Sequence, residues 1–95
     1  MKLEKDVEKY FREQVKKHGG LALKFTSPGT RGVPDRIVLY KGETIFVELK
    51  RPGGKLRADQ IKTLGVFSRQ LIPIYIIDTK EKVDHFVTKT MPNYN

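Results

Sequence analysis

The sequence predicts a mixed α/β fold, in the order αβββαβα, with a mixed sheet flanked by helices. Apolar residues recur at helical spacing in three segments, residues 3–18, 57–70 and 80–88. Short runs rich in β-branched, aromatic and aliphatic residues occupy four others, residues 21–25, 35–40, 44–50 and 73–78. No repeat, low-complexity tract or linker interrupts these segments, so we expect a single domain over residues 1–95.

The first predicted helix is amphipathic and has a clear end. Its apolar residues fall on one face, and His18-Gly19-Gly20 follows the last of them, Val15. A glycine just after a helix is a common C-terminal signal. Residues 26–34 contain too much glycine and proline for a helix or a strand, so we expect a loop between the first and second strands.

The remaining segments predict a hairpin, two helices and one more strand. Lys41-Gly42 between two strand-like runs is typical of a tight hairpin turn. We expect the helix over 57–70 to bury Ile61, Leu64 and Phe67. The nearly continuous apolar run over 73–78 predicts a strand covered on both faces. We expect the tail over about 90–95 to be frayed.

The composition narrows the possible functions. The chain has 19 Lys and Arg against 11 Asp and Glu, a net charge of +8, and no Cys. Without Cys, a disulfide scaffold, a thiolate zinc site and a thiol nucleophile are excluded. The positive charge indicates a polyanionic partner, with nucleic acid the leading candidate, although the charge alone is equally explained by solubility. The sequence contains no secretory signal or bilayer-length apolar run, so we expect a cytoplasmic protein without membrane association.

The predicted hairpin brings two carboxylates together. If Lys41 and Gly42 form a two-residue loop, paired residue numbers sum to 83 and Asp35 lies opposite Glu48. Strand alternation places Lys50 on the same face as Glu48. Opposed carboxylates repel unless a positive charge lies between them. The interpretation depends on the loop length, because one residue more or less breaks the pairing. Otherwise these residues are an exposed strand face with cross-strand charge pairs.

Two carboxylates beside a lysine suit a hard divalent cation. Mg²⁺ prefers oxygen ligands and is usually held by one or two carboxylates together with substrate phosphate, and Mn²⁺ is the alternative. In phosphodiester hydrolysis the ion polarises the phosphoryl oxygen and activates water, while a nearby ammonium stabilises the transition state. Asp35, Glu48 and Lys50 therefore predict a metal-dependent hydrolytic site.

Four segments resemble one family. Val33-Pro34-Asp35 followed by Glu48-Leu49-Lys50 resembles the bipartite motif of the PD-(D/E)xK nuclease superfamily, whose core has the same αβββαβ order. The resemblance is closer to stand-alone VRR-Nuc (virus-type replication-repair nuclease) domains of phages and bacteria. It covers nearly the whole chain and rests on the segments 19–21, 24–29, 32–36 and 46–53.

The resemblance implies roles for individual residues. Asp35, Glu48 and the main-chain carbonyl of Leu49 would be metal ligands, and Lys50 the catalytic lysine. Glu8 and Gln60 match a helical glutamate and glutamine that the family uses in catalysis, and Glu8 would also contact the metal directly or through water. Glu4 is the alternative to Glu8, and a solvated helix position is the alternative role for both Glu8 and Gln60.

Several polar and basic residues around this motif form a candidate phosphate-binding surface. Taken singly, each is better explained as a solvated surface residue, but as a set they suit DNA without sequence readout. The set comprises Lys24, Ser27, Arg31, Arg36, Arg51, Lys55 and Arg57. His18 and His85 have no partner histidine nearby, which argues against a histidine-based site.

The resemblance implies a Mg²⁺-dependent endodeoxyribonuclease. Small stand-alone members resemble Holliday junction resolvases, so we expect a homodimer that cleaves four-way DNA junctions, of phage or prophage origin. Two alternatives remain at this stage. The first is a flap or duplex-end nuclease with the same chemistry, and the second is a structure-specific DNA-binding module without turnover.

Overall fold

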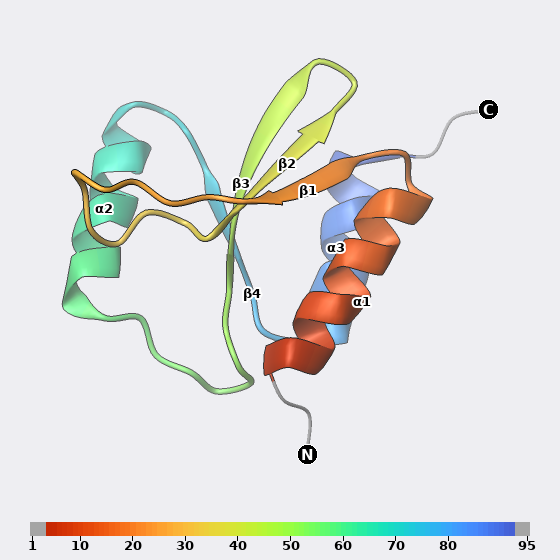
Figure 1. Cartoon of the computed structure of the whole chain (residues 1–95), viewed down its shortest axis with the longest axis horizontal. Coiled ribbons are helices and arrows are strands. Elements are labelled where there is room, and N and C mark those ends of the chain that lie inside the picture. Colours follow the sequence, from red (N-terminus) through yellow and green to blue (C-terminus); the bar gives the residue numbers. More distant parts are fainter. Residues whose placement is uncertain (1–3, 93–95) are drawn as a thin grey trace.

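The computed structural model describes residues 4–92 and has the predicted order of elements (Figure 1). The helices and strands are α1 (Glu4–Lys17), β1 (Leu21–Lys24), β2 (Arg36–Tyr40), β3 (Glu43–Leu49), α2 (Ala58–Arg69), β4 (Ile74–Ile77) and α3 (Lys80–Thr90). The predicted boundaries agree within a residue or two. Leu3, the expected first apolar residue of α1, lies outside the described residues.

The four strands form one mixed sheet in the order β1-β2-β3-β4. β1, β2 and β3 are antiparallel, whereas β4 runs parallel to β3. The predicted hairpin register is confirmed, since Tyr40 pairs with Glu43 and Arg36 with Val47. Lys41 and Gly42 both have positive φ, 44° and 83°, as a type I′ hairpin turn requires. This turn places the end of β3 beside the start of β2.

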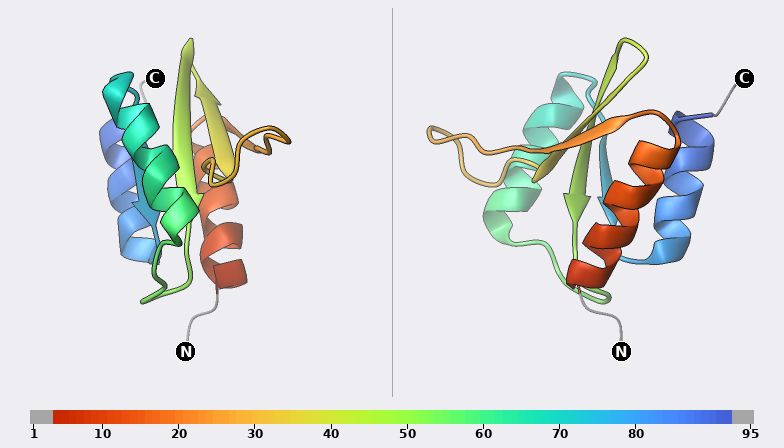
Figure 2. Two further views of the ribbon diagram at one scale, coloured as in Figure 1. Left: turned by 90° about the vertical axis from the view of Figure 1, so that its left-hand side faces the viewer. Right: turned by 45° about the vertical axis from the view of Figure 1, so that its right-hand side comes forward.

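The helices cover opposite faces of the sheet (Figure 2). α1 and α3 pack together through Phe11 and Phe86, whose ring centroids lie 5.9 Å apart. They share one buried core with the inward residues of β2, β3 and β4: Val38, Tyr40, Ile45, Val47, Leu49 and Ile77. On the other face, Phe67 of α2 makes an edge-to-face contact with Phe46 of β3 at 5.2 Å. Side chains alternate between the two faces of a strand, so Glu48, two residues after Phe46, also faces α2.

One expectation about burial is wrong, and another holds only in part. Ile61 of α2 is 57% exposed, whereas the buried residues of that helix are Gln60 and Thr63. The helix is rotated so that its polar first turn, and not Ile61, faces β3. β4 is an edge strand that contacts α2 on one face of the sheet and α3 on the other, as expected, although Ile76 on the α2 side is still 37% exposed.

The C-terminal segment is more ordered than expected. α3 continues to Thr90, and Met91 is fully buried in the core. The hydroxyl of Tyr40 donates a hydrogen bond to the carbonyl of Pro92. The predicted fraying is therefore wrong for residues 90–92, because apolar burial and a hydrogen bond to β2 hold them. Residues 93–95 lie outside the described part of the chain.

None of the three helices between residues 4 and 92 combines the length and apolar character of a membrane-spanning segment. α1, the longest, has 14 residues.

Candidate active site

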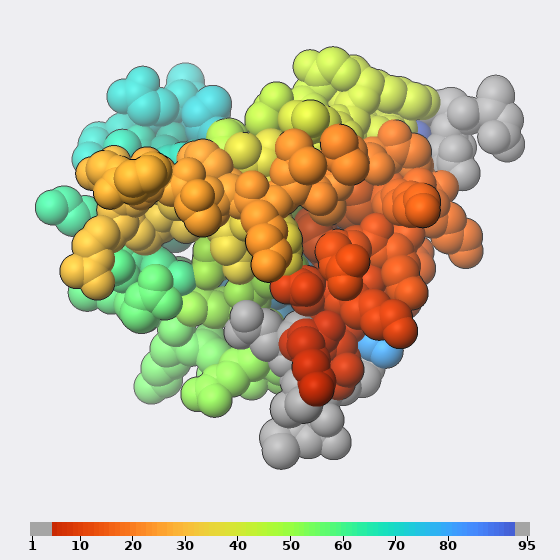
Figure 3. Space-filling view, in the orientation of Figure 1, coloured from red at the N-terminus to blue at the C-terminus, as the bar shows by residue number. Residues whose placement is uncertain are grey.

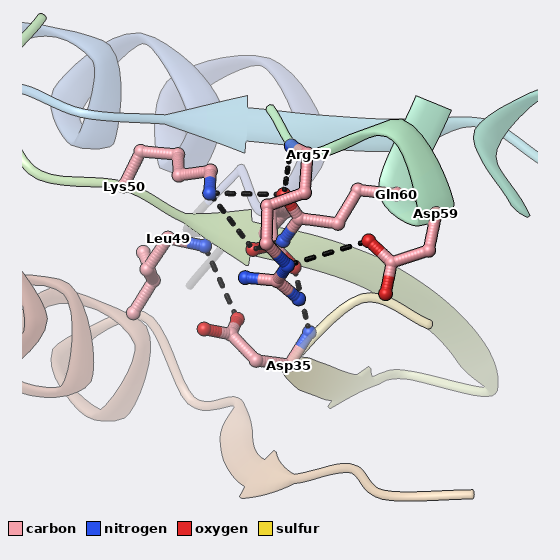
Figure 4. A network of polar contacts seen from close by, with 7 residues as sticks. Asp35, Leu49, Lys50, Arg57, Asp59 and Gln60 are labelled. Carbon is pink, nitrogen blue, oxygen red and sulfur yellow. Dashed lines mark hydrogen bonds and ion pairs between the residues drawn. The ribbon is translucent and has the colours of Figure 1, made fainter. Parts of the chain in front are cut away.

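The carboxylates of Asp35 and Glu48 lie where β2 begins and β3 ends, and each accepts a hydrogen bond from a main-chain amide of the neighbouring strand end (Figure 4). The amide of Asp35 donates to Oε1 of Glu48 at 3.2 Å. The amide of Leu49 donates to Oδ1 of Asp35 at 3.1 Å. The hairpin register positions both groups. Because Arg36 pairs with Val47, Asp35, the residue before β2, lies opposite Glu48 near the end of β3. The structure thus brings together the predicted pair and the main chain of Leu49.

Glu48 is a buried carboxylate with a neighbouring negative charge. Its residue is 8% exposed. Burial, followed by the negative charge of Asp35, raises the pKa of Glu48 to about 7. The Nζ of Lys50 lies 4.0 Å from Oε2 of Glu48, and its charge acts in the opposite direction. The positive charges of Lys50 and Arg57 therefore only partly offset the effect of burial and of Asp35 on the pKa of Glu48.

Gln60 connects the carboxylate side of the site to its lysine. Its Nε2 donates to Oε2 of Glu48 at 2.7 Å, and its Oε1 accepts from Nζ of Lys50 at 3.0 Å. The same Oε1 accepts from the amide of Arg57 at 2.8 Å, which caps the start of α2. Gln60 thus joins α2 to the end of β3, and it lies where the resemblance implies.

The loop between β1 and β2 is closely fitted to the first turns of α2. Thr63 Oγ1 donates to the carbonyl of Arg31 at 2.6 Å. Gly32 has a φ of 81°, and a Cβ at this position would lie 2.3 Å from the carbonyl oxygen of Asp59. Only glycine fits this close approach. Figure 3 shows the chain from β1 running across this face of the molecule towards α2.

Most of the predicted phosphate-binding residues are accessible. Lys24, Arg31, Arg51, Lys55 and Arg57 are exposed and Ser27 is half-buried. Asp59, which the sequence reasoning missed, lies among them. Its carboxylate is 3.3 Å from Nε of Arg57 and 3.7 Å from Nε of Arg31. An acidic residue in a first helical turn is usually explained by the helix dipole, so the sequence offers no separate signal for this contact.

Arg36 contradicts its predicted role. Its residue is 4% exposed and its guanidinium is hydrogen-bonded to the Glu8 carboxylate of α1. Strand alternation turns Arg36 towards α1 and away from the face of Asp35 and Glu48. It is therefore not part of a surface that contacts phosphate. Glu8 lies beside Arg36, and its catalytic role stays a prediction. The side chain of Glu4, the alternative to Glu8, lies outside the described part of the chain.

The donor set suits a hard divalent cation. Both side chains present carboxylate oxygens, which are the ligands that Mg²⁺ and Mn²⁺ prefer. The raised pKa of Glu48 reflects negative charge in a partly desolvated place, which a cation would neutralise. Within residues 4–92 no cluster of three or more His, Cys, Asp or Glu side chains has a metal-binding arrangement. Asp35 and Glu48 thus fit an ion that keeps water or substrate oxygens as further ligands.

One known protein is similar in sequence. No protein-family model matches the chain. Over 60 residues it is 52% identical to a protein described as "Putative nuclease p44" from Acyrthosiphon pisum secondary endosymbiont phage 1. The matched segment is 62% of this chain, and it spans only 64% of the length of that relative.

A solved structure is similar over almost its whole length. It is described as a VRR_NUC domain, and it matches 92% of this chain and 96% of its own with a TM-score of 0.82 and 28% sequence identity. The motifs of the sequence, the mixed sheet with three helices and the two similarities point to one conclusion. The chain is therefore similar to VRR_NUC domains and shares their fold, with a PD-(D/E)xK-like core.

Proposed function

We propose that the protein is a divalent-metal-dependent endonuclease that hydrolyses phosphodiester bonds in DNA. One observation carries the proposal: two carboxylates, Asp35 and Glu48, are fixed by main-chain hydrogen bonds beside the ammonium of Lys50. A protein that only binds DNA gains nothing from paired carboxylates next to a polyanion, because they repel it. The phage protein with which the chain shares 52% identity is itself described as a putative nuclease.

The proposed chemistry assigns separate tasks to the residues of the site. Asp35 and Glu48, with the main-chain carbonyl of Leu49, would hold Mg²⁺ or Mn²⁺. When bound, the ion polarises the phosphoryl oxygen and lowers the pKa of a coordinated water. Lys50 holds a positive charge where the negative charge of the transition state develops, or orients the attacking water. Gln60 keeps the Lys50 ammonium beside Glu48 through its hydrogen bonds to both.

The exposed cations around the site would position DNA through its phosphates. Phosphate contacts give affinity and register without reading sequence. Ser27 belongs to the proposed surface as a hydroxyl donor, and the loop that carries it is held against α2. The proposed cationic members are Lys24, Arg31, Arg51, Lys55 and Arg57.

We further propose a four-way junction as the substrate and a homodimer as the active form. The support is the resemblance to small stand-alone VRR-Nuc domains and Holliday junction resolvases. Symmetric cleavage of two strands requires two sites at a fixed separation, which a two-fold dimer supplies. The phage source of the similar protein supports a phage or prophage origin, with action inside a bacterial cell.

The test compares cleavage of an end-labelled four-way junction with cleavage of a linear duplex of the same arm sequence. Each substrate is incubated with Mg²⁺, Mn²⁺ or EDTA and with wild type, Asp35→Asn or Lys50→Ala. Lys89→Ala, an exposed lysine at the other end of the sheet, is the matched control. We expect paired nicks near the branch point, dependent on metal, and an analytical-ultracentrifugation mass of twice the 11.0 kDa chain.

Lys50→Ala and Asp35→Asn should lose cleavage for different reasons. Lys50→Ala should bind junction and Mn²⁺ but cleave about 100- to 1,000-fold more slowly. Asp35→Asn should lose Mn²⁺ affinity as well. Equal cutting of junction and duplex would leave a nuclease without junction specificity. Junction binding without cleavage in either metal would instead identify a DNA-binding module.

A further inference from the structure

We infer that Thr63 is a positioning residue that fixes Arg31 for contact with DNA phosphate. It does so by holding the main chain of the loop between β1 and β2 against α2 (Figure 1). The inference rests on the proposed function in taking Arg31 as one of the residues that contact DNA. It goes beyond that function by giving a task to a buried residue outside both the proposed metal site and the cationic surface.

The hydroxyl of Thr63 is bonded to a segment far away in the sequence. Thr63 lies in α2 and is only 5% exposed. A threonine hydroxyl in a helix commonly bonds to a carbonyl of the preceding turn of its own helix. The hydroxyl of Thr63 instead donates to the carbonyl of Arg31 at 2.6 Å, across 32 residues of chain. The bond therefore joins α2 to the loop.

The side chain of Arg31 is not fixed by packing, because it is 91% exposed. Its Nε lies 3.7 Å from the carboxylate of Asp59, and an exposed ion pair of this kind is too weak to hold a long side chain in one place. The position of the guanidinium therefore depends on where the main chain of residue 31 lies. A fixed main chain also leaves less conformational freedom to be lost when the guanidinium binds a phosphate.

The main chain next to Arg31 lies directly on the first turn of α2. Gly32 has a φ of 81°, and a Cβ there would lie 2.3 Å from the carbonyl oxygen of Asp59. The absence of a side chain at residue 32 permits this approach, and the hydrogen bond from Thr63 supplies a directional contact that maintains it.

The base of the loop is closed by contacts that do not involve Thr63. The amide of Phe25 donates to the carbonyl of Asp35 at 2.9 Å, and Pro34 is fully buried. Loss of the Thr63 bond should therefore release the outer part of the loop, with Arg31, and leave Asp35 in place. This separation predicts weaker DNA binding with an unchanged affinity for Mn²⁺.

The first test is a double-mutant cycle on DNA affinity, measured by fluorescence anisotropy of a linear duplex in EDTA. Thr63→Val removes the hydroxyl but keeps the branched shape, and Arg31→Ala removes the guanidinium. Arg31→Ala should weaken binding about five- to tenfold. Thr63→Val should weaken binding about threefold when Arg31 is present and less than about 1.5-fold when it is absent. Thr63→Ser keeps the hydroxyl and should bind DNA as wild type does.

Three controls separate positioning of Arg31 from a general effect. Lys55→Ala leaves Arg31 intact, so Thr63→Val should still weaken binding about threefold in that background. Thr88→Val makes the same change at an exposed threonine of α3 and should leave DNA affinity unchanged. The Mn²⁺ affinity of Thr63→Val, measured by calorimetry, should equal that of wild type.

Limited proteolysis reports the position of the loop without DNA. Trypsin must lift the peptide unit between Arg31 and Gly32 off α2 before it cleaves there. Cleavage after Arg31 should be about three- to tenfold faster in Thr63→Val, because proteolysis follows the population of the open loop. Cleavage after Lys41, in the exposed turn between β2 and β3, is the internal control. If Thr63→Val does not fold, Gly32→Ala displaces the same peptide unit and replaces it in the cycle.

Three results would overturn the inference: an equal loss of DNA affinity from Thr63→Val with and without Arg31, wild-type affinity in Arg31→Ala, or unchanged cleavage after Arg31. Failure of the proposed function would look different. A wild type that binds DNA without cleaving it would overturn the nuclease, and the cycle in EDTA would still decide the role of Thr63. A wild type that does not bind DNA would overturn both.

Discussion

At the residue scale, Gln60 connects the Glu48 carboxylate of the candidate site to Lys50 and to the start of α2. It is 6% exposed, and both ends of its amide are hydrogen-bonded to site residues or to the start of α2. Removing it takes the amide donor from Oε2 of Glu48, whose Oε1 keeps the Asp35 amide, and takes the hydrogen-bond acceptor from Nζ of Lys50. Buried polar groups that lose their partners destabilise a fold by about 1–3 kcal/mol each.

We therefore expect Gln60→Ala to slow DNA cleavage by about 10- to 100-fold, as is typical of residues that orient metal ligands. The free energy of unfolding should fall by about 1–3 kcal/mol. Single-turnover cleavage and urea denaturation measure the two effects. Gln70→Ala, at the exposed end of the same helix, is the control and should change neither.

Asp59 supplies a second residue-scale prediction. Its carboxylate is ion-paired with both Arg31 and Arg57 and would repel a phosphate that approached these two guanidinium groups. Asp59→Asn should raise DNA affinity about two- to tenfold, because exposed ion pairs of this kind are worth about 0.2–1 kcal/mol each. Fluorescence anisotropy in EDTA measures binding without cleavage. Glu81→Gln on α3 makes the same charge change elsewhere, and an equal gain there would refute the local explanation.

The sequence predicted some site residues better than others for a physical reason. Asp35, Glu48 and Lys50 share one hairpin, so turn length and strand alternation are sufficient to bring them together. Arg36 was misplaced because a basic residue beside a motif looks the same whether α1 covers it or not. The Asp59 contacts depend on how a loop lies on α2, which no local spacing encodes.

At the element scale, α2 ends in a conformation that its sequence does not favour. The amides of Ile72 and Leu71 donate to the carbonyls of Phe67 and Ser68, both at 2.9 Å, which is a Schellman arrangement. Leu71 has a φ of 61°, a position where glycine is usual. Its side chain is 89% exposed, so it gains little burial in return.

Leu71→Gly should therefore raise the free energy of unfolding by about 1 kcal/mol, because it removes the left-handed strain of a branched side chain. Chemical denaturation at equilibrium measures the change. Gln70→Gly is the matched control, since residue 70 has a φ of −89° and gains nothing from glycine. A loss of stability in Leu71→Gly would show that the exposed leucine makes contacts that outweigh the strain.

Helices and strands with a strong apolar periodicity were predictable from the sequence. The rotation of a helix against the sheet was less predictable. α1 and the hairpin follow from apolar spacing and turn chemistry. For α2, the same spacing predicted burial of Ile61, but the hydrogen bonds of Gln60 and Thr63 turn the polar side of the helix inwards. Satisfying buried polar groups therefore decided the rotation of this helix.

At the scale of the whole molecule, the net charge of +8 predicts that the affinity for DNA falls steeply as the salt concentration rises. If all five exposed cations of the proposed surface contact phosphates, the logarithm of affinity should fall with that of salt with a slope of about −4.5. Affinity would then drop roughly 500-fold between 50 and 200 mM salt. Anisotropy titrations in EDTA over this range measure the slope.

Variants identify which cations contribute to that slope. Arg57→Ala should reduce its magnitude by about 0.9, the contribution of one phosphate contact. Lys89→Ala, on α3 at the other end of the sheet, should leave it unchanged. Equal effects of the two variants would mean that DNA is attracted by net charge and not by the proposed surface.

The hydrogen bonds of the site have a consequence for how the chain folds. Those among Asp35, Glu48, Leu49, Lys50 and Gln60 join residues only 10 to 14 positions apart, whereas Tyr10 of α1 reaches Asp84 of α3 across 74. Short loops close at a smaller entropic cost, so we expect the hairpin and α2 to form early in folding. Substitutions in the contact between α1 and α3, such as Phe11→Leu, should then accelerate unfolding and leave the folding rate nearly unchanged. The residues proposed for chemistry would thus assemble first, and the terminal helices would determine how long the assembled protein persists.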